Sequence, residues 1–595
     1  MRAFAARISF GDLPLLIYFI AFVREYFWIL PNNYIAWPLT ACVSLGLWYW
    51  YIRMRPGQAD HVHPSFWLIV GLPLLFLFST RIAYPDLSFD VLTYHIVHSE
   101  RALSGALYIP GDFFFAQFPS IDPASDMITG ITRHVLGFRA GVVINLIALL
   151  WLGTVMDRIL RLYISSGWIR SLLLLACVSS EFLLAEINNY MVDLLALPLL
   201  MEMLWIGIRP ANDDRPPAAD LSFFMLLGGM AVALKITNIV FVTPLLIFYA
   251  FRLWRVHGWP TLKNDSALAR SAIFFIAPIL PYVIYITYRT GSPVFPLYNK
   301  VFRSPLLGQV NIYDGRWGPR GLLETLIWPI KIFFVPDRLS ELNMYSGRIG
   351  LGCLAAVAGL LIGRKDWRLG GLCFTMLVGS FLWSEGSGYI RYGLFLEPLG
   401  ALVIVLLIVS LVTGRGGRRS IVAYPLAALL GVALVVQCYR GAVLSYDHEW
   451  SGRPNCYRQR GCRDGLAHLF RDRELPLNDD LRNRLAGVDV WVESTLKTGS
   501  IMTLAKPEVP GIGVVEEYYR GTGSQEEFRH SLELMRGKRF FSLVFRDDVA
   551  DAKHWLASKR FAIKNIDEVD VPFFSTTDTL AMSLIELEPP RPQDQ

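Results

Sequence analysis

The sequence has few charged residues and no internal repeat or low-complexity tract. Charged residues make up 18% of the 595 positions and hydrophobic residues 53%, with a mean hydropathy of +0.40. The apolar residues form blocks long enough to cross a bilayer, which indicates a polytopic membrane protein. Blocks such as Leu172–Val178, Leu402–Val409 and Ala423–Val436 are continuously apolar and do not alternate, so we predict helical spans.

Cysteine is also scarce, with seven residues in the chain. Four of them fall in predicted spans and lack metal-ligand spacing: Cys42, Cys177, Cys353 and Cys373. Only Cys456 and Cys462 lie close together in a polar segment; they form a local disulfide if that segment is extracytoplasmic and stay free thiols if it is not. We therefore assign no metal ligands and no certain cofactor, and a divalent cation remains an open alternative.

The ends of the first apolar run argue against a cleavable signal. After Arg2 and Arg7 the run exceeds signal length and carries Arg24 and Glu25, so we expect a retained span. The net charge of +6 is poor evidence for a nucleic-acid partner, since most basic residues fall in short loops between spans.

Hydropathy predicts about thirteen membrane helices. They cover 12–30, 36–52, 66–83, 140–157, 171–187, 191–208, 221–236, 238–254, 271–289, 348–363, 370–384, 393–412 and 421–438. Arg and Lys gather in alternate short loops, which places those loops and the N-terminus in the cytoplasm. The longer loops 84–134 and 290–347, the Glu385–Arg391 turn and the chain after about Arg440 then lie on the extracytoplasmic side.

The chain changes character after about Arg440, so we divide it into a membrane domain (1–439) and a small extracytoplasmic α/β domain (440–595). Short β-type strings alternate there with helical patterns such as Asp551–Arg560. The strings are Val488–Val492, Phe541–Phe545 and Met582–Leu587. This domain carries no Gly-rich phosphate loop and no Cys/His metal set, so we interpret it as an accessory or substrate-selecting cap.

The loop 84–134 is the longest polar interruption in the first half of the chain and is rich in Asp and His. Wound as a helix, residues 91–104 place Leu92, Ile96 and Leu103 opposite Asp90, Thr93, Tyr94, His98 and Arg101, which predicts an amphipathic helix on the membrane surface. Asp90 is our candidate catalytic carboxylate and Asp86 the second. The alternative is that Asp90 or Ser88 only caps the helix.

Two basic residues and one further acid stand out at the extracytoplasmic ends of spans. Asp193, in the turn Glu186–Asp193, either orients an acceptor, or binds a cation with Asn189, or starts a helix. An enzyme without access to ATP needs a pre-activated, membrane-borne donor, and Lys235 and Arg391 are the candidates for its phosphate. The alternatives are snorkelling for Lys235 and an ion pair with Glu385 or Glu397 for Arg391; Lys300 and Arg303 are weaker candidates.

Four motifs resemble those of the bacterial GT-C glycosyltransferases, a polytopic superfamily that includes protein mannosyltransferases and aminoarabinose transferases. They are S-F-D-V-L-T-Y-H-I at 88–96 with F-P-S at 118–120, A-L-K-I-T-N at 233–238, T-G-S-P-V-F-P-L-Y-N at 290–299 and I-R-Y-G-L-F at 390–395. The ordered set spans about 84–412. Val91 follows Asp90 where many relatives carry a second acid, which keeps the choice between Asp90 and Asp86 open.

The resemblance implies a GT-C-like helical bundle with loop helices above it, and an inverting transfer of a sugar from a polyprenyl-phosphate carrier to a glycan, lipid or protein acceptor at a bacterial inner membrane. Asp90, Asp86 and Asp193 would be catalytic, and Arg391 and Lys235 would bind the donor phosphate. Tyr94, His95, Tyr298 and Asn299 are the expected substrate-binding residues. The alternatives are an O-antigen polymerase or ligase, and a lipid-linked-sugar transporter or flippase.

Overall fold

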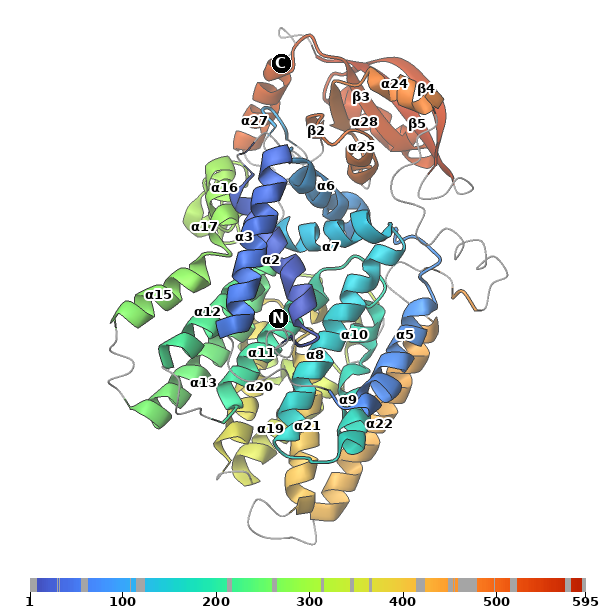
Figure 1. The fold of residues 1–595 in the computed structure, drawn as a ribbon. Coiled ribbons are helices and arrows are strands. Elements are labelled where there is room, and N and C mark those ends of the chain that lie inside the picture. The colour runs from blue at the N-terminus through green and yellow to red at the C-terminus, as the bar shows by residue number, and fades with distance from the viewer. Residues whose placement is uncertain are drawn as a thin grey trace.

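The structure is a computed structural model, and its description covers most of the chain. The described residues are 8–28, 30, 33–54, 62–107, 109–113, 123–210, 217–258, 265–311, 315–342, 347–362, 366–413, 423–447, 453, 455–457, 479–496, 498–513, 522–572 and 579–590. A helical bundle fills the lower part of the molecule and a small domain with a β-sheet stands above it (Figure 1).

Helices occupy all of the segments predicted as spans. The N-terminal half contains α2 (Asp12–Tyr26), α3 (Asn33–Met54), α4 (Pro64–Phe66), the π-helical η1 (Trp67–Gly71), α5 (Leu72–Ser79), η4 (Ala140–Val142), α8 (Val143–Arg161), α9 (Gly167–Val178), α10 (Glu181–Ala185), η5 (Asp193–Ala196), α11 (Leu197–Ile208), α12 (Pro217–Leu234), η6 (Ile236–Asn238) and α13 (Ile239–His257). The bundle continues with α15 (Asp265–Ile276), α16 (Leu280–Thr290), α17 (Asn299–Phe302), α18 (Leu322–Lys331), η7 (Pro336–Arg338), α19 (Arg348–Ile362), α20 (Trp367–Gly386), η8 (Ile390–Gly393), α21 (Leu396–Thr413) and α22 (Ala423–Asp447).

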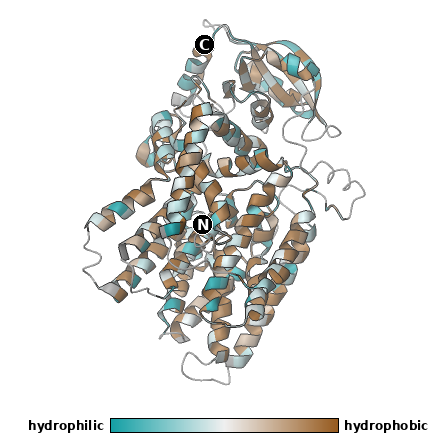
Figure 2. Cartoon of the chain, in the orientation of Figure 1, coloured by the Kyte–Doolittle hydropathy of each residue, from teal (hydrophilic) through white to brown (hydrophobic). Residues whose placement is uncertain are grey.

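Not every one of these helices crosses a membrane by itself. In the described part of the chain, five are long and apolar enough to do so by length and composition: Asn33–Arg53, Ala140–Arg161, Ile236–Val256, Leu396–Thr413 and Tyr424–Asp447. Ser266–Ile276 and Leu280–Thr290 pass the same test as a pair, bent by 61°, and four shorter apolar helices accompany them. Hydrophobic residues cover the bundle helices (Figure 2), as expected for a multi-pass membrane protein.

At two close helix crossings, glycine allows the two backbones to approach each other. A Cβ atom on Gly229 of α12 would lie 2.1 Å from the backbone oxygen of Phe275 in α15, and one on Gly352 of α19 would lie 2.6 Å from the Cα of Gly400 in α21. Small residues at such crossings let helix backbones approach within a membrane, where dispersion contacts supply much of the packing energy.

The first large loop forms a layer between the bundle and the upper domain (Figure 1). It contains the π-helical turn η2 (Val91–His95), α6 (Ile96–Ser104) and α7 (Pro123–Leu136). The helix predicted over 91–104 is present as η2 and α6, and the polar face of this amphipathic helix is covered by protein. Thr93, His98 and Arg101 are buried, because the upper domain and α7 cover that face.

The C-terminal domain has a mixed five-stranded sheet in the order β2-β1-β3-β5-β4. The strands are β1 (Val490–Glu493), β2 (Gly511–Gly513), β3 (Phe540–Phe545), β4 (Ala562–Pro572) and β5 (Thr579–Glu588), and the helices are α24 (Asp479–Ala486), α25 (Gly499–Ala505), α27 (Thr522–Leu534), η9 (Arg546–Asp548) and α28 (Val549–Ser558). Strand β1 pairs in parallel with β2 and β3, and β5 runs antiparallel to β3 and β4. All three predicted strands and the predicted helix are present. The last bundle helix, α22, extends to Asp447, past the boundary predicted near residue 440.

The first loop joins the sheet of this domain at its β2 edge. Phe113 donates its backbone N–H to the oxygen of Gly511 at 2.7 Å and forms a parallel bridge with Ile512. Asp112 accepts the N–H of Gly511 at 2.6 Å and forms a buried ion pair with Arg101. Ser500 of α25 donates to the oxygen of Val91 at 3.1 Å, so the domain contacts the turn that follows Asp90.

We expect the buried Arg101–Asp112 pair to hold the upper domain on the loop. Asp112→Ala leaves a buried guanidinium without its carboxylate, at a cost of about 3–5 kcal/mol. Hydrogen exchange of Gly511–Gly513 should accelerate accordingly. The matched control is Asp489→Ala, which removes an exposed pair with Arg539 and should cost under about 1 kcal/mol. Equal protection in the two variants would contradict this role for the buried pair.

Candidate active site

Arg391 is the centre of a chain of alternating acids and bases. Its Nη1 donates to Asp90 Oδ2 at 2.7 Å, while its Nε and Nη2 donate to Asp193 Oδ2 at 3.2 and 3.1 Å. Nη2 also lies 3.1 Å from the sulfur of Met191. The Arg391 side chain is 11% exposed and that of Asp193 only 1%. One guanidinium thus joins the first loop, the turn before α11 and the short helix η8.

The turn that carries Arg391 is shaped by two glycines and by hydrogen bonds from two tryptophans. Gly388 has a φ of +61°, which favours glycine, and its oxygen accepts the indole N–H of Trp328 at 3.0 Å. Trp383 donates its indole N–H to the oxygen of Tyr389 at 2.8 Å. A Cβ atom on Gly393 would lie 2.6 Å from the Trp383 ring. These contacts turn the chain sharply between α20 and α21 and leave Arg391 facing the loop.

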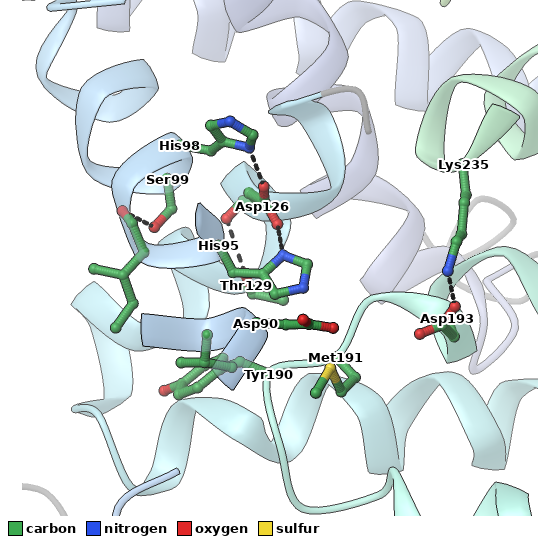
Figure 3. Close-up of polar contacts among 12 residues, drawn as sticks. Asp90, His95, His98, Ser99, Asp126, Thr129, Tyr190, Met191, Asp193 and Lys235 are labelled. Carbon is green, nitrogen blue, oxygen red and sulfur yellow. Dashed lines mark hydrogen bonds and ion pairs between the residues drawn. The ribbon is translucent and has the colours of Figure 1, made fainter. Parts of the chain in front are cut away.

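Lys235 occupies a break between two helices. Helix α12 ends at Leu234, Lys235 is extended, and η6 and α13 follow. Asn238 stabilises the break by donating to the oxygen of Ala231 at 2.8 Å. Lys235 is buried, forms an ion pair with Asp193 (Figure 3), and its Nζ lies 4.3 Å from the centre of the Tyr392 ring. Its partner is therefore a buried carboxylate, in place of the solvent expected for a snorkelling lysine.

Asp90 is the residue before η2, at its N-cap position, but its side chain makes no capping hydrogen bond. The alternative that it only caps the helix is therefore wrong, because its carboxylate is bonded to Arg391. Burial alone would raise the pKa of Asp90, but the neighbouring Arg391 guanidinium is the largest of the influences that lower it, and the pKa lies below its ordinary value. The Tyr94 ring, on the same turn, lies 4.4 Å from the His95 ring, centroid to centroid. Asp90 is held as an anion, with its side chain 20% exposed.

Asp86 has different contacts. Its two carboxylate oxygens accept the backbone N–H groups of Ser88 at 3.0 Å and Tyr190 at 2.8 Å, and the residue is buried. These bonds tie the start of the first loop to the turn that leads into Asp193. Asp86 is thereby suited to positioning the loop, while Asp90 carries the contact with Arg391.

A second set of polar contacts lies directly behind Asp90. His95 Nδ1 is 2.6 Å from one oxygen of Asp126 and His98 Nδ1 is 2.7 Å from the other. Asp126 is on α7 and is completely buried. Figure 3 shows the His95 ring between the carboxylates of Asp126 and Asp90. His95 was expected from the sequence to bind substrate; its pairing with Asp126 was not foreseen.

Glu186 is a buried acid that sequence reasoning passed over in favour of Asp193. It is fully buried, and within the described residues neither carboxylate oxygen has a hydrogen-bond partner. Asp193, Arg391, Lys235 and Asp90 are its electrostatic neighbours. A buried carboxyl without a partner is costly in its charged form, so Glu186 adds a group that can change protonation beside the two cations.

Asn299 and Tyr298, the two residues of the second large loop that were predicted to bind substrate, have other surroundings in the structure. Asn299 is buried and its amide donates to the oxygens of Ser304, Leu307 and Gly308, while its oxygen accepts the N–H of Ser304. That amide thus holds its own loop together. Tyr298 is 60% exposed. Asn189, the expected cation partner of Asp193, donates to the oxygen of Ala185 and accepts the N–H of Met191.

The charges of the site balance among its own residues. Two cations, Arg391 and Lys235, contact two carboxylates, Asp90 and Asp193. No group of three or more metal-ligating side chains is found in the part of the chain that the structure describes. An incoming anion must therefore compete for Arg391 with Asp90, its more exposed partner.

Comparisons with known proteins give a distant structural likeness. No protein-family model matches the chain, and no curated protein matches its sequence. The chain is similar to the crystal structure of ArnT from Cupriavidus metallidurans bound to undecaprenyl phosphate, with a TM-score of 0.46 and 14% identity over 88% of this chain and 98% of that one. The apo structure of the same ArnT gives a TM-score of 0.44 and 14% identity over 87% and 97%.

Proposed function

We propose that the chain is an inverting glycosyltransferase that uses a polyprenyl-phosphate-linked sugar at the extracytoplasmic face of the membrane. The observation that carries the proposal is the contact of Arg391 with both Asp90 and Asp193, with Lys235 completing the cluster. A guanidinium and an ammonium side by side suit a phosphate group. A carboxylate held next to them suits the deprotonation of an acceptor.

The reaction assigns one role to each group. The donor phosphate binds Arg391 and Lys235 and takes the place of Asp90 on the guanidinium. Asp90 then accepts the proton of the acceptor hydroxyl while its oxygen forms a bond to the anomeric carbon. The bond from that carbon to the phosphate oxygen breaks, its electrons leave with the polyprenyl phosphate, and the configuration at the carbon inverts. Positioning of the two substrates supplies much of the rate.

Two features of the structure support our proposal that the site lies on the extracytoplasmic side of the membrane. Cys456 is disulfide-bonded, which is typical of oxidising compartments; its expected partner Cys462 lies outside the described residues. The large loops and the C-terminal domain also join one another: Arg453 donates to the oxygens of Tyr84 and Asn188, and Arg289 to that of Asp112. These contacts support a site on the side to which the positive-inside rule assigns these loops.

The test is sugar transfer by the purified protein in lipid bilayers, supplied with a polyprenyl-phosphate-linked sugar pool and a membrane extract of acceptors. We expect release of polyprenyl phosphate together with a product whose anomeric configuration, measured by NMR, is opposite to that of the donor. Retained configuration would contradict the single displacement. Movement of the lipid-linked sugar between leaflets without release of phosphate would favour a flippase instead.

A further inference from the structure

The pair formed by Asp126 and His95 lies behind Asp90 and takes no part in phosphate binding. His95 Nδ1 is 2.6 Å from Asp126 Oδ1, so the imidazole donates there and its neutral form has an acceptor lone pair at Nε2. Nε2 is buried, and among the described residues it has no hydrogen-bond partner. A buried acceptor without a donor is costly in a resting structure, which points to a partner that arrives during the reaction.

The surroundings of His95 fix its orientation. Asp126 is completely buried and its second oxygen is 2.7 Å from His98 Nδ1. The titratable and charged groups around His95 and Asp90 include Asp126 on α7, Arg391 on η8, and Tyr94 and His98 on their own segment. Helix α25 packs against the same turn and contributes no titratable side chain within Gly499–Ala505. The imidazole is therefore locked between a buried carboxylate and Asp90.

We propose that His95, oriented by Asp126, takes from Asp90 the proton that the acceptor gives up. This inference rests on the proposed function. When the donor phosphate occupies Arg391, the Asp90 carboxylate is released beside His95 Nε2. The proton moves from the acceptor oxygen to Asp90 and then to Nε2, and the imidazolium is stabilised by Asp126. After transfer His95 returns the proton to solvent, so the cycle needs no further reactant.

The electrostatics of Asp90 favour such a partner. Burial would raise the pKa of Asp90, but the neighbouring Arg391 guanidinium is the largest of the influences that lower it, and the pKa lies below the ordinary value. Once released from Arg391, Asp90 is still a carboxylate, which is a weaker base than an imidazole, so a proton on Asp90 can pass to a neutral imidazole near neutral pH. The arrangement follows the general logic of a base oriented by a buried acid. His95 acts through Asp90 and does not touch the sugar.

The sharpest test is His95→Gln, because glutamine keeps a polar side chain of similar size but cannot take up a proton. We expect the maximal transfer rate to fall about 10- to 100-fold, less than the full effect of a general base, with the affinity for polyprenyl phosphate unchanged. The wild-type rate should decrease as the pH falls through the range in which imidazoles titrate, about pH 5–8, and His95→Gln should lose that decrease. Asp126→Asn should shift the pH at which the transfer rate decreases, without changing the affinity for polyprenyl phosphate.

The matched control is His134→Gln. His134 also pairs with a carboxylate between α6 and α7, at 2.8 Å from Glu100, but at the exposed end of α7. The His134→Gln variant should keep the wild-type rate and pH profile. A His95→Gln enzyme with the wild-type rate and pH profile would overturn the inference while leaving the proposed function intact. Absence of transfer by the wild type would instead overturn the proposed function.

Discussion

Arg391→Ala is expected to abolish detectable sugar transfer. The substitution removes the guanidinium that contacts Asp90 and Asp193, and it leaves two carboxylates and Glu186 facing Lys235 alone. Truncating one partner of a buried, hydrogen-bonded charge pair costs about 2–5 kcal/mol. Since every 1.4 kcal/mol is a factor of ten, affinity for undecaprenyl phosphate should fall about 30- to 4,000-fold. Isothermal titration in detergent and the transfer assay measure the two effects separately.

The control for this variant is Arg209→Ala. Arg209 forms an ion pair with Asp220 in the bundle, at 2.5 Å and with a side-chain exposure of 12%, similar to that of Arg391. It lies at the end of α11 that leads away from the site, so its loss should change stability without changing phosphate affinity. Arg391→Lys should restore part of the binding, because an ammonium keeps the charge but loses the fork geometry. If Arg391→Ala bound undecaprenyl phosphate as the wild type does, the phosphate site would lie elsewhere.

Asp90→Asn is expected to separate binding from chemistry. Asparagine cannot accept the acceptor proton, so the maximal transfer rate should fall about 10²–10⁴-fold. The same change removes the carboxylate that competes for Arg391, so the affinity for undecaprenyl phosphate should rise or stay constant. A residue that merely supports the loop would lower both quantities together.

The comparison that matters for Asp90 is Asp86→Asn. Asp86 accepts two backbone N–H groups that fasten the loop, and an amide oxygen replaces only part of that function. We expect Asp86→Asn to reduce stability and transfer in parallel. A large, selective loss of transfer in Asp86→Asn with full activity in Asp90→Asn would reverse the assignment of the base.

Much of the site could be predicted from the sequence, because charged residues are rare in membrane-spanning segments and are easily recognised there. Lys235 and Arg391 break the charge bias of their side, and Asp193 stands in a tight turn between apolar helices. The structure brings these residues together with Asp90 in direct contacts. Their pairing was not predictable, since the contacts join segments about 40 to 300 positions apart in the chain and no local pattern encodes such separations.

Three features of the structure were not predicted from the sequence, each for a physical reason. Helical periodicity marked the polar face of 91–104 but cannot distinguish solvent from another domain, and here Ser500 and Asp126 cover that face. His95 and His98 are three residues apart and so reach the same carboxylate, but that carboxylate, Asp126, lies 31 and 28 positions away on another helix, which local periodicity does not show. Strand β4 reads as charged and mostly exposed, which hides it from a hydrophobic pattern.

The most direct test of the site is an experimental structure with undecaprenyl phosphate bound. We expect the phosphate within hydrogen-bond distance of both the Arg391 guanidinium and the Lys235 ammonium, with Asp90 no longer bonded to Arg391 and turned toward His95. A phosphate bound away from both residues, for instance at the exposed Lys300 and Arg303, with the contact between Asp90 and Arg391 intact, would contradict the assignment.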